Sequence, residues 1–421
     1  MRRIELAVLI VLLLMPRAAA AQGDPLGPEF RINTYTTTGV TEFDSASVAV
    51  DPSGNFVVVW SAPPGLPPLG TAEIFGQRYL AGGVPVGSEF RVNTFTPNPQ
   101  YGPAVASDPF GNFVVTWSDF ASDGSGGGVF AQRFASSGAP LGPQFRVNTE
   151  TTGFQNSGSV AVGGTGDFVV VWRSDAPSGP DIKGQRYASS GAPVGPEFRV
   201  NTTTAFAQRQ PVAAADSAGD FVVVWSSQYQ ASPAGPSVYG QRFASSGAPL
   251  GPEFRVNTYT SDTSFQEDAS VHMGSLGDFV VVWSSDEQDG SDDGVFAQRF
   301  VASGAALGPE FRVNTFTSGY QAHADVAADA SGNLVVIWAS NAQDGSEAGI
   351  FGQRFDSSGT PLGPEFRVNT YTTGRQSRPS VGADPLGRFV VVWGSEQDTY
   401  NIFGQRYSPI FPVELMRFRV E

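Results

Sequence analysis

Seven tryptophans divide this sequence into units of nearly equal length, and no other feature constrains the fold as strongly. Neighbouring tryptophans lie 53 to 58 residues apart, and each ends a segment such as Phe-Val-Val-Val-Trp. They are Trp60, Trp117, Trp172, Trp225, Trp283, Trp338 and Trp393. A period of this length, with several short apolar segments per unit, is typical of repeat folds in which each unit buries its surface against its neighbours.

Each unit contains four candidate strands separated by turns rich in Gly and Pro. In the first unit they span residues 47–50, 56–60, 74–79 and 89–94. The second strand is apolar without alternation, so both of its faces must be covered. The third strand has Gly or Ala at one fixed position, as at Gly76, which predicts a close approach by a neighbouring unit. The sequence therefore predicts an all-β fold, a seven-bladed β-propeller of four-stranded antiparallel blades.

The order of strands along the chain predicts how the ring closes. Residues 29–34 have the sequence of a fourth strand, whereas the last unit ends with its third strand at residues 401–407. The N-terminal strand is therefore expected to complete the last blade, which leaves no open sheet edge between the two ends of the ring.

The two ends of the sequence lie outside the repeats. Arg2 and Arg3 precede a ten-residue apolar run and then Ala19-Ala20-Ala21, a pattern typical of a signal peptide and too short to span a bilayer. We therefore divide the chain into a signal peptide at 1–21, the propeller at 22–410 and a C-terminal tail at 411–421. We expect a bacterial protein that is secreted, periplasmic or on the cell surface, without an integral membrane segment after cleavage.

Charge and cysteine content restrict the partners. The net charge is −15, which disfavours binding to nucleic acid or to anionic membranes. The chain has no cysteine, so the fold uses no disulfide. We expect a monomer that binds a glycan or a protein.

The repeated blocks Phe-Val-Val-Val-Trp, Phe-Gly-Gln-Arg-Phe and Glu-Phe-Arg-Val-Asn-Thr resemble those of secreted bacterial propeller repeat proteins that are largely uncharacterised. The resemblance covers residues 29 to 407. There is a looser similarity to FG-GAP repeats and to Asp-box propellers, although the aromatic residues after the Asp51-Pro52-Ser53-Gly54 turn do not match the Asp-box spacing. These resemblances imply a propeller fold and no particular activity.

In a propeller, the turns between strands 1 and 2 and between strands 3 and 4 share one face, and the remaining loops share the other. The first set is almost constant in this sequence and the second set varies, so we expect a ligand to bind the second face. Five units have a glutamine at one position before the first strand, where the amides would rim the axial opening. These candidate ligand-binding residues are Gln100, Gln155, Gln266, Gln321 and Gln376, whereas Phe43 and Ala207 take the position in units 1 and 4. The alternative is that each glutamine bonds the backbone of its own loop.

One loop between strands 2 and 3 of the fifth unit is strongly acidic. Clustered carboxylates and carbonyls are the ligands that Ca²⁺ prefers, so this loop is a candidate calcium site, although it lacks the EF-hand pattern. The candidate ligands are Asp286, Asp289, Asp292 and Asp293. The alternative is a solvated Gly-rich turn.

Other recurring charges are expected to be structural. Asp at the start of five 1–2 turns, as at Asp108, is expected to cap its own turn. The repeated Arg of strand 3 and Glu of strand 4, such as Arg78 and Glu89, are expected to pair within a blade. His272 and His323 are the two histidines, and they are candidates to share a metal with Asp268 or Asp325 only if the fold brings them together.

These features favour a non-catalytic binding or adhesion protein. A sialidase-like glycoside hydrolase is the alternative, but it needs converging arginines for the substrate carboxylate and a carboxylic acid with a nucleophile. The arginines outside the repeat pattern show no obvious triad; they are Arg173, Arg209, Arg375, Arg378 and Arg388. A purely structural role in the cell envelope is a third possibility.

Overall fold

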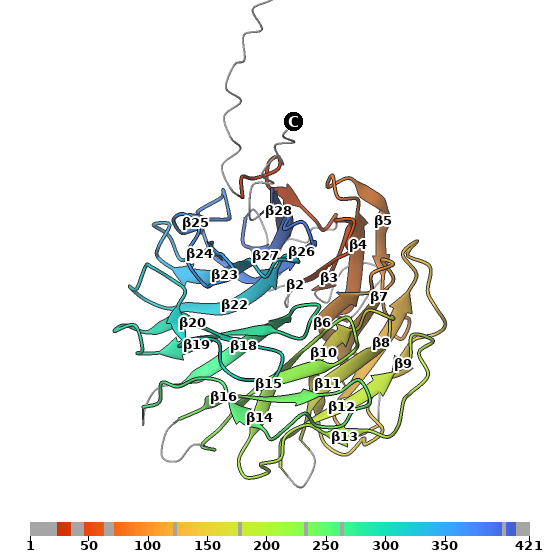
Figure 1. Cartoon of the computed structure of the whole chain (residues 1–421). Coiled ribbons are helices and arrows are strands. Elements are labelled where there is room, and N and C mark those ends of the chain that lie inside the picture. The colour runs from red at the N-terminus through yellow and green to blue at the C-terminus, as the bar shows by residue number, and fades with distance from the viewer. Residues whose placement is uncertain are drawn as a thin grey trace, which may run out of the picture.

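The computed structural model describes residues 23–34, 46–62, 71–120, 124–175, 179–230, 235–261, 265–397 and 401–409. These residues form seven four-stranded antiparallel sheets arranged around a central axis, as Figure 1 shows. The predicted seven-bladed β-propeller is therefore confirmed. In the described part of the chain, no helix is long and apolar enough to cross a membrane. The predicted signal peptide and the C-terminal tail lie outside the described residues.

Each blade has an inner strand next to the axis and a long second strand paired with it. The inner strands are β2 (Ala46–Val50), β6 (Gln100–Ser107), β10 (Gln155–Val162), β14 (Gln208–Ala215), β18 (Gln266–Met273), β22 (Gln321–Ala328) and β26 (Gln376–Ala383). The second strands are β3 (Phe56–Ala62), β7 (Phe113–Asp119), β11 (Phe168–Ser174), β15 (Phe221–Ser227), β19 (Phe279–Asp286), β23 (Leu334–Asn341) and β27 (Phe389–Ser395). We number the blades 1 to 7 in this order.

A third strand and an outer strand complete each blade. The third strands are β4 (Glu73–Tyr79), β8 (Gly128–Phe134), β12 (Asp181–Tyr187), β16 (Ser237–Phe243), β20 (Asp293–Phe300), β24 (Ala348–Phe355) and β28 (Asn401–Tyr407). The outer strands are β5 (Pro85–Arg91), β9 (Phe145–Arg146), β13 (Phe198–Arg199), β17 (Phe254–Arg255), β21 (Phe311–Arg312), β25 (Phe366–Arg367) and β1 (Phe30–Arg31).

The N-terminal strand closes the ring. Blade 7 has the strand order β1-β28-β27-β26, with Phe30 opposite Gly404 and Arg31 opposite Phe403. Its outer strand therefore comes from the beginning of the chain and its other three strands come from the end, as the strand order in the sequence predicts.

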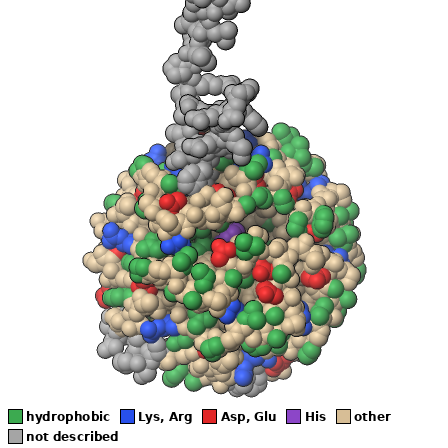
Figure 2. Space-filling view, viewed as in Figure 1, with side chains coloured by type: hydrophobic (Ala, Val, Ile, Leu, Met, Phe, Trp, Pro, Cys, Tyr) green, Lys and Arg blue, Asp and Glu red, His purple; other side chains and the backbone are tan. Residues whose placement is uncertain are grey.

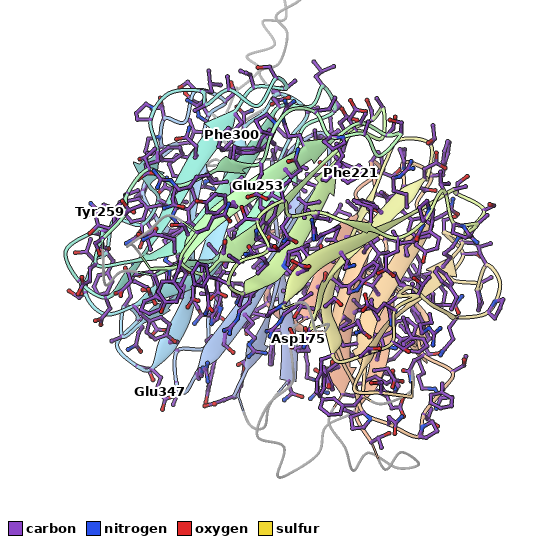
Figure 3. All side chains as sticks on the ribbon, turned by 90° about the horizontal axis from the view of Figure 1, so that it is seen from below. Asp175, Phe221, Glu253, Tyr259, Phe300 and Glu347 are labelled. Atoms are coloured by element: carbon purple, nitrogen blue, oxygen red, sulfur yellow. The ribbon has the colours of Figure 1, made fainter. Side chains whose placement is uncertain are left out.

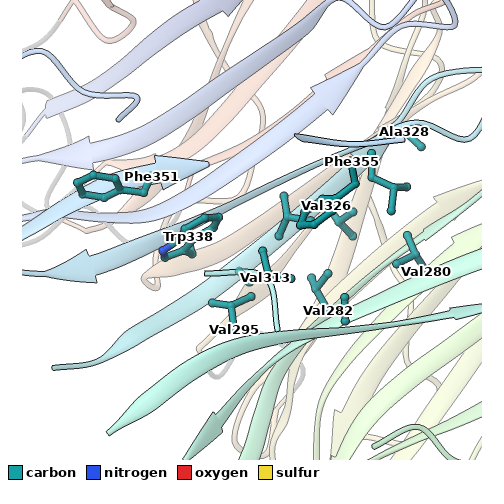
Figure 4. Close-up of a cluster of buried hydrophobic side chains, with 13 residues drawn as sticks. Val280, Val282, Val295, Val313, Val326, Ala328, Trp338, Phe351 and Phe355 are labelled. Atoms are coloured by element: carbon teal, nitrogen blue, oxygen red, sulfur yellow. The ribbon is translucent and has the colours of Figure 1, made fainter. Parts of the chain in front are cut away.

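The hydrophobic core lies between blades, where the apolar second strands meet. All seven tryptophans are at most 1% exposed. In the cluster drawn in Figure 4, Val280 and Val282 of β19 pack against Val326 of β22 and Trp338 of β23, so the cluster joins blades 5 and 6. Such a core explains why the second strand has no polar face.

The small residue of strand 3 has a different role from the predicted one. A Cβ added to Gly76 would lie 2.9 Å from the ring of Phe90, which belongs to the outer strand of the same blade. The same phenylalanine position lies over Gly184, Gly240 and Gly352. The small residue therefore makes room for a ring of its own blade and not for a neighbouring blade.

The repeated Arg and Glu residues link neighbouring blades, so the predicted pairing within a blade is wrong. Arg78 of blade 1 donates to the carbonyl of Ser136 in blade 2 at 2.9 Å, and Arg406 of blade 7 donates to the carbonyl of Ala81 in blade 1 at 3.0 Å. The Glu position accepts from a threonine of the preceding blade, as between Thr34 and Glu89 at 2.8 Å. The other six of these links are Thr94–Gln144, Thr149–Glu197, Thr202–Glu253, Thr258–Glu310, Thr315–Glu365 and Thr370–Glu29. They run around the whole ring.

Candidate functional site at the variable face

The two ends of the blades form two unlike faces. We call the face of the 1–2 and 3–4 turns the uniform face, and the face of the 2–3 and 4–1 loops the variable face. In the side view of Figure 3, Phe221 and Phe300 lie toward the uniform face, whereas Asp175 and Glu347 lie toward the variable face.

Aspartates hold the turns of the uniform face, as the sequence predicts. Asp108 accepts hydrogen bonds from the backbone N–H groups of Phe110 and Asn112, both at 2.9 Å. The equivalent bonds are made by Asp51, Asp216, Asp329 and Asp384. These carboxylates are used within the turns, so a structural role accounts for their recurrence.

A bulge near the start of the inner strand places one residue of each of blades 2 to 7 in a left-handed conformation. The pairing register shifts there, for example between Glu267 and Ser270. The third residue of the strand has φ between 50° and 60° in all six blades: Gly102, Ser157, Gln210, Asp268, His323 and Arg378. Only glycine takes this conformation freely, and other residues in it are strained by about 1–3 kcal/mol. Five different non-glycine side chains at one repeated, strained position indicate a function outside the scaffold.

Four of these side chains, from blades 4 to 7, form what we call the polar arc: Gln210, Asp268, His323 and Arg378. Gln210 donates from Nε2 to Asp268 Oδ1, and Asp268 Oδ2 lies 3.1 Å from His323 Nδ1. Burial raises the pKa of Asp268, but hydrogen bonds from His323 and Gln210 and the charge of Arg378 outweigh it and hold the pKa below its ordinary value. Asp268 of blade 5 is therefore an ionised acceptor between Gln210 of blade 4 and His323 of blade 6. Because the Nδ1 atom of His323 faces Asp268, the Nε2 atom of the same ring is left for another partner.

Aromatic rings lie on the other side of the variable face, in loops of blades 2 to 4 and, for the half-buried Tyr101, at the start of β6. Phe120 packs edge-on against Phe154 with ring centroids 5.4 Å apart, and Tyr101 lies 5.5 Å from Phe120. We call these three the aromatic patch. A second pair, Phe206 and Tyr229, makes an edge-on contact at 5.8 Å. The variable face thus combines apolar ring surfaces with a hydrogen-bonding arc.

The five predicted glutamines lie inside the blades and not at the surface of the opening. Their residues are 0–1% exposed. The Oε1 atom of Gln100 accepts from Trp117 Nε1 at 2.7 Å, and that of Gln266 accepts from Trp283 Nε1 at 3.0 Å. Gln155, Gln321 and Gln376 donate to backbone carbonyls of their own loops. These side chains are buried within the blades and most of their amide atoms bond there, so they are not exposed to a ligand on this face.

The prediction that Ala207 takes the glutamine position in unit 4 is wrong. Gln208, and not Ala207, occupies the glutamine position there, because it begins β14 and accepts from Trp225 Nε1 at 2.8 Å. In blades 2 to 7 this glutamine lies 17 residues before the tryptophan of the same blade. That constant spacing is the sequence feature that indicates a structural role for the glutamine.

The acidic loop of blade 5 brings only some of its carboxylates together. Asp286 and Asp293 are directly opposite each other on β19 and β20. Asp289 instead accepts from Asn314 Nδ2 and from the backbone N–H of Ser291, both at 3.2 Å. Asp292 is exposed. In the residues that the structure describes, no group of three or more His, Asp and Glu side chains is arranged to hold a metal ion, and Ca²⁺ binding stays a prediction.

The two histidines lie apart, and the unrepeated arginines are divided between the two faces. His323 lies near the start of its inner strand and His272 near the end of another, so they belong to opposite faces. Arg173 pairs with Asp175 at 2.7 Å, and Arg388 pairs with Asp384 on the uniform face at 2.5 Å. Arg209 and Arg378 belong to the inner strands at the variable face, on blades 4 and 7. Arg388 therefore cannot join the unrepeated arginines of the variable face.

Comparison with known proteins supports the architecture alone. No family model and no curated protein matches the chain. Among solved structures, an α-L-arabinanase from Penicillium chrysogenum has a TM-score of 0.52 at 13% identity, covering 92% of this chain and 98% of that one. An α-L-arabinofuranosidase from Fusarium graminearum has a TM-score of 0.55 at 11% identity with the same coverage. An ulvan lyase has a TM-score of 0.52 at 13% identity, covering 87% of this chain and 94% of that one.

Proposed function

We propose that this protein is a carbohydrate-binding propeller that holds a glycan on its variable face, between the aromatic patch and the polar arc. The observation that carries the proposal is the polar arc itself, in which strained, unlike side chains occupy one position of an otherwise regular repeat. Sugar rings have apolar C–H faces that pack on aromatic side chains, and hydroxyl groups that need hydrogen-bond partners. The aromatic patch and the polar arc offer these two kinds of contact on one face. The similar solved structures include enzymes that act on glycans, which supports the same ligand class.

The test is a glycan array followed by calorimetric titration of the best ligand. Phe120→Ala removes a ring of the aromatic patch, and Asp268→Asn removes the charge from the centre of the polar arc. Each variant is expected to bind at least about tenfold more weakly, a loss of about 1.4 kcal/mol.

Phe110→Ala is the matched control, since Phe110 is an exposed phenylalanine of the uniform face. It should bind like the unaltered protein. Equal affinity for all three variants would overturn the proposal. Repeating the titration with EDTA tests the predicted role of Ca²⁺ in the same measurement.

A catalytic role is the second candidate, and one observation favours it. Glu267 neighbours Asp268, and its pKa is raised by burial and then by the charge of Asp268, whereas that of Asp268 is lowered. Neighbouring carboxyl groups with opposite pKa shifts suit an acid and a base of glycan cleavage. Release of new reducing ends from the bound glycan, abolished by Glu267→Gln, would establish catalysis. An unchanged glycan after prolonged incubation would leave binding as the function.

Secretion belongs to the proposal as well. If the signal peptide is cleaved after Ala21, the mature protein isolated from a bacterial culture begins at Gln22. N-terminal sequencing of the exported protein checks this position.

A further inference from the structure

A cavity of about 560 Å³ opens on the axis at the uniform face, opposite the proposed glycan site. Its wall is formed by the ends of the inner strands and by the 1–2 turns of all seven blades. His272 is the histidine of this wall, and Figure 2 shows a histidine in a central hollow of the face in view. The volume lies within the usual range for small-molecule sites.

Blade 5 departs from the repeat where it lines this cavity. His272 lies opposite Val280 in the sheet, and the same position is small in every other blade. The six equivalents are Ala49, Ala106, Ala161, Ala214, Ala327 and Gly382. The next residues also differ, because Gly274 starts a turn that begins with Asp in five blades, and Leu276 at its tip is 84% exposed.

The missing aspartate changes the junction between blades 5 and 6. Where the turn begins with Asp, this carboxylate lies against the glycine of the next turn, so that a Cβ on Gly54 would be 2.9 Å from Asp384 Oδ2 and one on Gly111 would be 3.1 Å from Asp51 Oδ2. Blade 3 also lacks the aspartate, with Gly163 in its place, but it keeps the small Ala161 where blade 5 has His272. Gly274 has no such side chain. The cavity extends here from the axis to Phe300 of blade 5 and Leu334 of blade 6.

Asp278 takes a different position from its equivalents in the neighbouring blades. Asp220 and Asn333 accept from the backbone N–H of the 3–4 turn of their own blade, at 2.8 and 3.1 Å. A Cβ added to Gly274 would instead lie 2.8 Å from Asp278 Oδ1. The Asp278 carboxylate therefore lies beside the position from which the turn aspartate extends in other blades. The same carboxylate lines the cavity.

The cavity combines an uncharged imidazole with carboxylates at its edge. Burial lowers the pKa of His272 to about 4, although the charges of Asp278 and Asp329 act to raise it, so the ring is neutral at pH 7 and has a free acceptor nitrogen. Met273, Leu276 and Val280 supply apolar contact beside it. A ligand that matches these groups has an apolar body and a positively charged hydrogen-bond donor.

We propose that the cavity at the uniform face is a second binding site, which takes a small primary amine with an apolar body. The ammonium group donates to Asp278 and to the imidazole of His272, and the apolar body packs against Met273 and Leu276. This site lies at the opposite end of the axis from the polar arc, and its occupation does not depend on the proposed glycan function.

Nuclear magnetic resonance can test the site directly, because the chain has two histidines, one at each face, and Met273 is the methionine of the described residues. The probe is cyclohexylamine, with cyclohexanol and cyclohexanecarboxylate as neutral and anionic controls of the same shape. We expect millimolar cyclohexylamine to shift the His272 imidazole and Met273 methyl signals and to leave His323 unchanged. Cyclohexanecarboxylate should shift none of them.

The double variant His272→Ala with Asp278→Asn gives blade 5 residues that other blades have at these positions, such as Ala327 and Asn333, and it is therefore expected to fold. It should bind cyclohexylamine at least tenfold more weakly, as followed by the Met273 methyl signal. His323→Ala is the control at the variable face and should bind the amine like the unaltered protein. Binding of the alcohol or carboxylate as tight as that of the amine, or unchanged affinity in the double variant, would overturn the proposal.

Discussion

The uniform and variable faces are opposite ends of the same strands, yet they expose different chemistry. The exposed large hydrophobic residues of the uniform face are nearly all aliphatic, such as Leu80, Leu276 and Leu386. Among the described residues, those of the variable face are all aromatic: Phe95, Phe120, Phe154, Phe206, Tyr229 and Phe265. A repeat protein can thus keep one end of every blade nearly constant while the other end diverges.

Backbone conformation distinguishes the two faces as clearly as side chains do. On the uniform face, the turns place glycine in the left-handed region, as at Gly54 and Gly111. On the variable face, Ser157, His323 and other larger residues occupy that region. The uniform face therefore avoids backbone strain, and the variable face retains it, which is the pattern expected when stability is optimised at one end and a site at the other.

The largest expected effect on stability comes from the uniform face. Asp384 is 1% exposed and accepts from two backbone N–H groups and from Arg388 Nε. Asp384→Ala leaves these donors without an acceptor and should lower the free energy of unfolding by about 2–3 kcal/mol. Asp292→Ala, an exposed acid on the variable face, should change it by less than about 0.5 kcal/mol. Urea denaturation compares the two, and equal midpoints would contradict the division between the faces.

The next effect is a pH dependence of stability that arises on the variable face. Burial, followed by the charges of Asp286 and Glu267, raises the pKa of Asp293 to about 6. The unfolded chain therefore loses this proton at a lower pH than the folded one, and this contribution to stability is lost as pH rises from about 4 to about 6.

Asp293→Asn should remove this loss and stabilise the protein at pH 7 by about 1–2 kcal/mol. The measurement is the melting temperature between pH 4 and pH 7, with Asp292→Asn as the exposed control. A stability curve with the same slope in both variants would exclude Asp293 as its source.

The smallest effect is a gain of stability. Ser157 has φ of 56°, and Ser157→Gly should relieve its strain and raise the free energy of unfolding by about 0.5–1 kcal/mol. The reverse exchange on the uniform face, Gly54→Ala, should destabilise the protein, because φ is 84° and the new Cβ would lie 2.7 Å from the Arg388 guanidinium. Denaturation curves that move in the same direction for both variants would refute this comparison.

The architecture was predictable because its signals are local and repeated. The tryptophan period predicts the number of blades, and the apolar second strands predict which strands are buried. The fourth-strand sequence at residues 29–34 predicts how the ring closes. The Arg and Glu links were not predictable, since a repeat makes pairing within a unit and pairing with the next unit look identical in sequence. The three-dimensional structure is needed to show that the partner lies in the neighbouring blade, as Ser136 does for Arg78.

The sequence predicts which face varies between blades, but it does not predict the residues of the polar arc. The glutamines recur from unit to unit, and recurrence in a repeat indicates a structural role. Here Gln100 and Gln266 accept hydrogen bonds from the indole N–H of a tryptophan. The polar arc is the opposite case, because Asp268, His323 and Arg378 are separated by one repeat each and differ from one another. The bulge that strains these residues has no sequence signature, because it depends on how the inner strand pairs with the second strand of the same blade, as β18 pairs with β19.

The pairing of β1 with β28 also has a consequence for the order of assembly. Strand β1 is among the first parts of the chain to be synthesised, whereas β28 is near the last, so residues 30 and 404 cannot meet until almost the whole chain is available. Six blades can form from consecutive residues, but the seventh requires a contact across nearly the full sequence length, which is entropically slow to make. Ring closure should therefore be the last step of folding, and until then the exposed edge of β28 is the place where two incomplete chains could pair with each other.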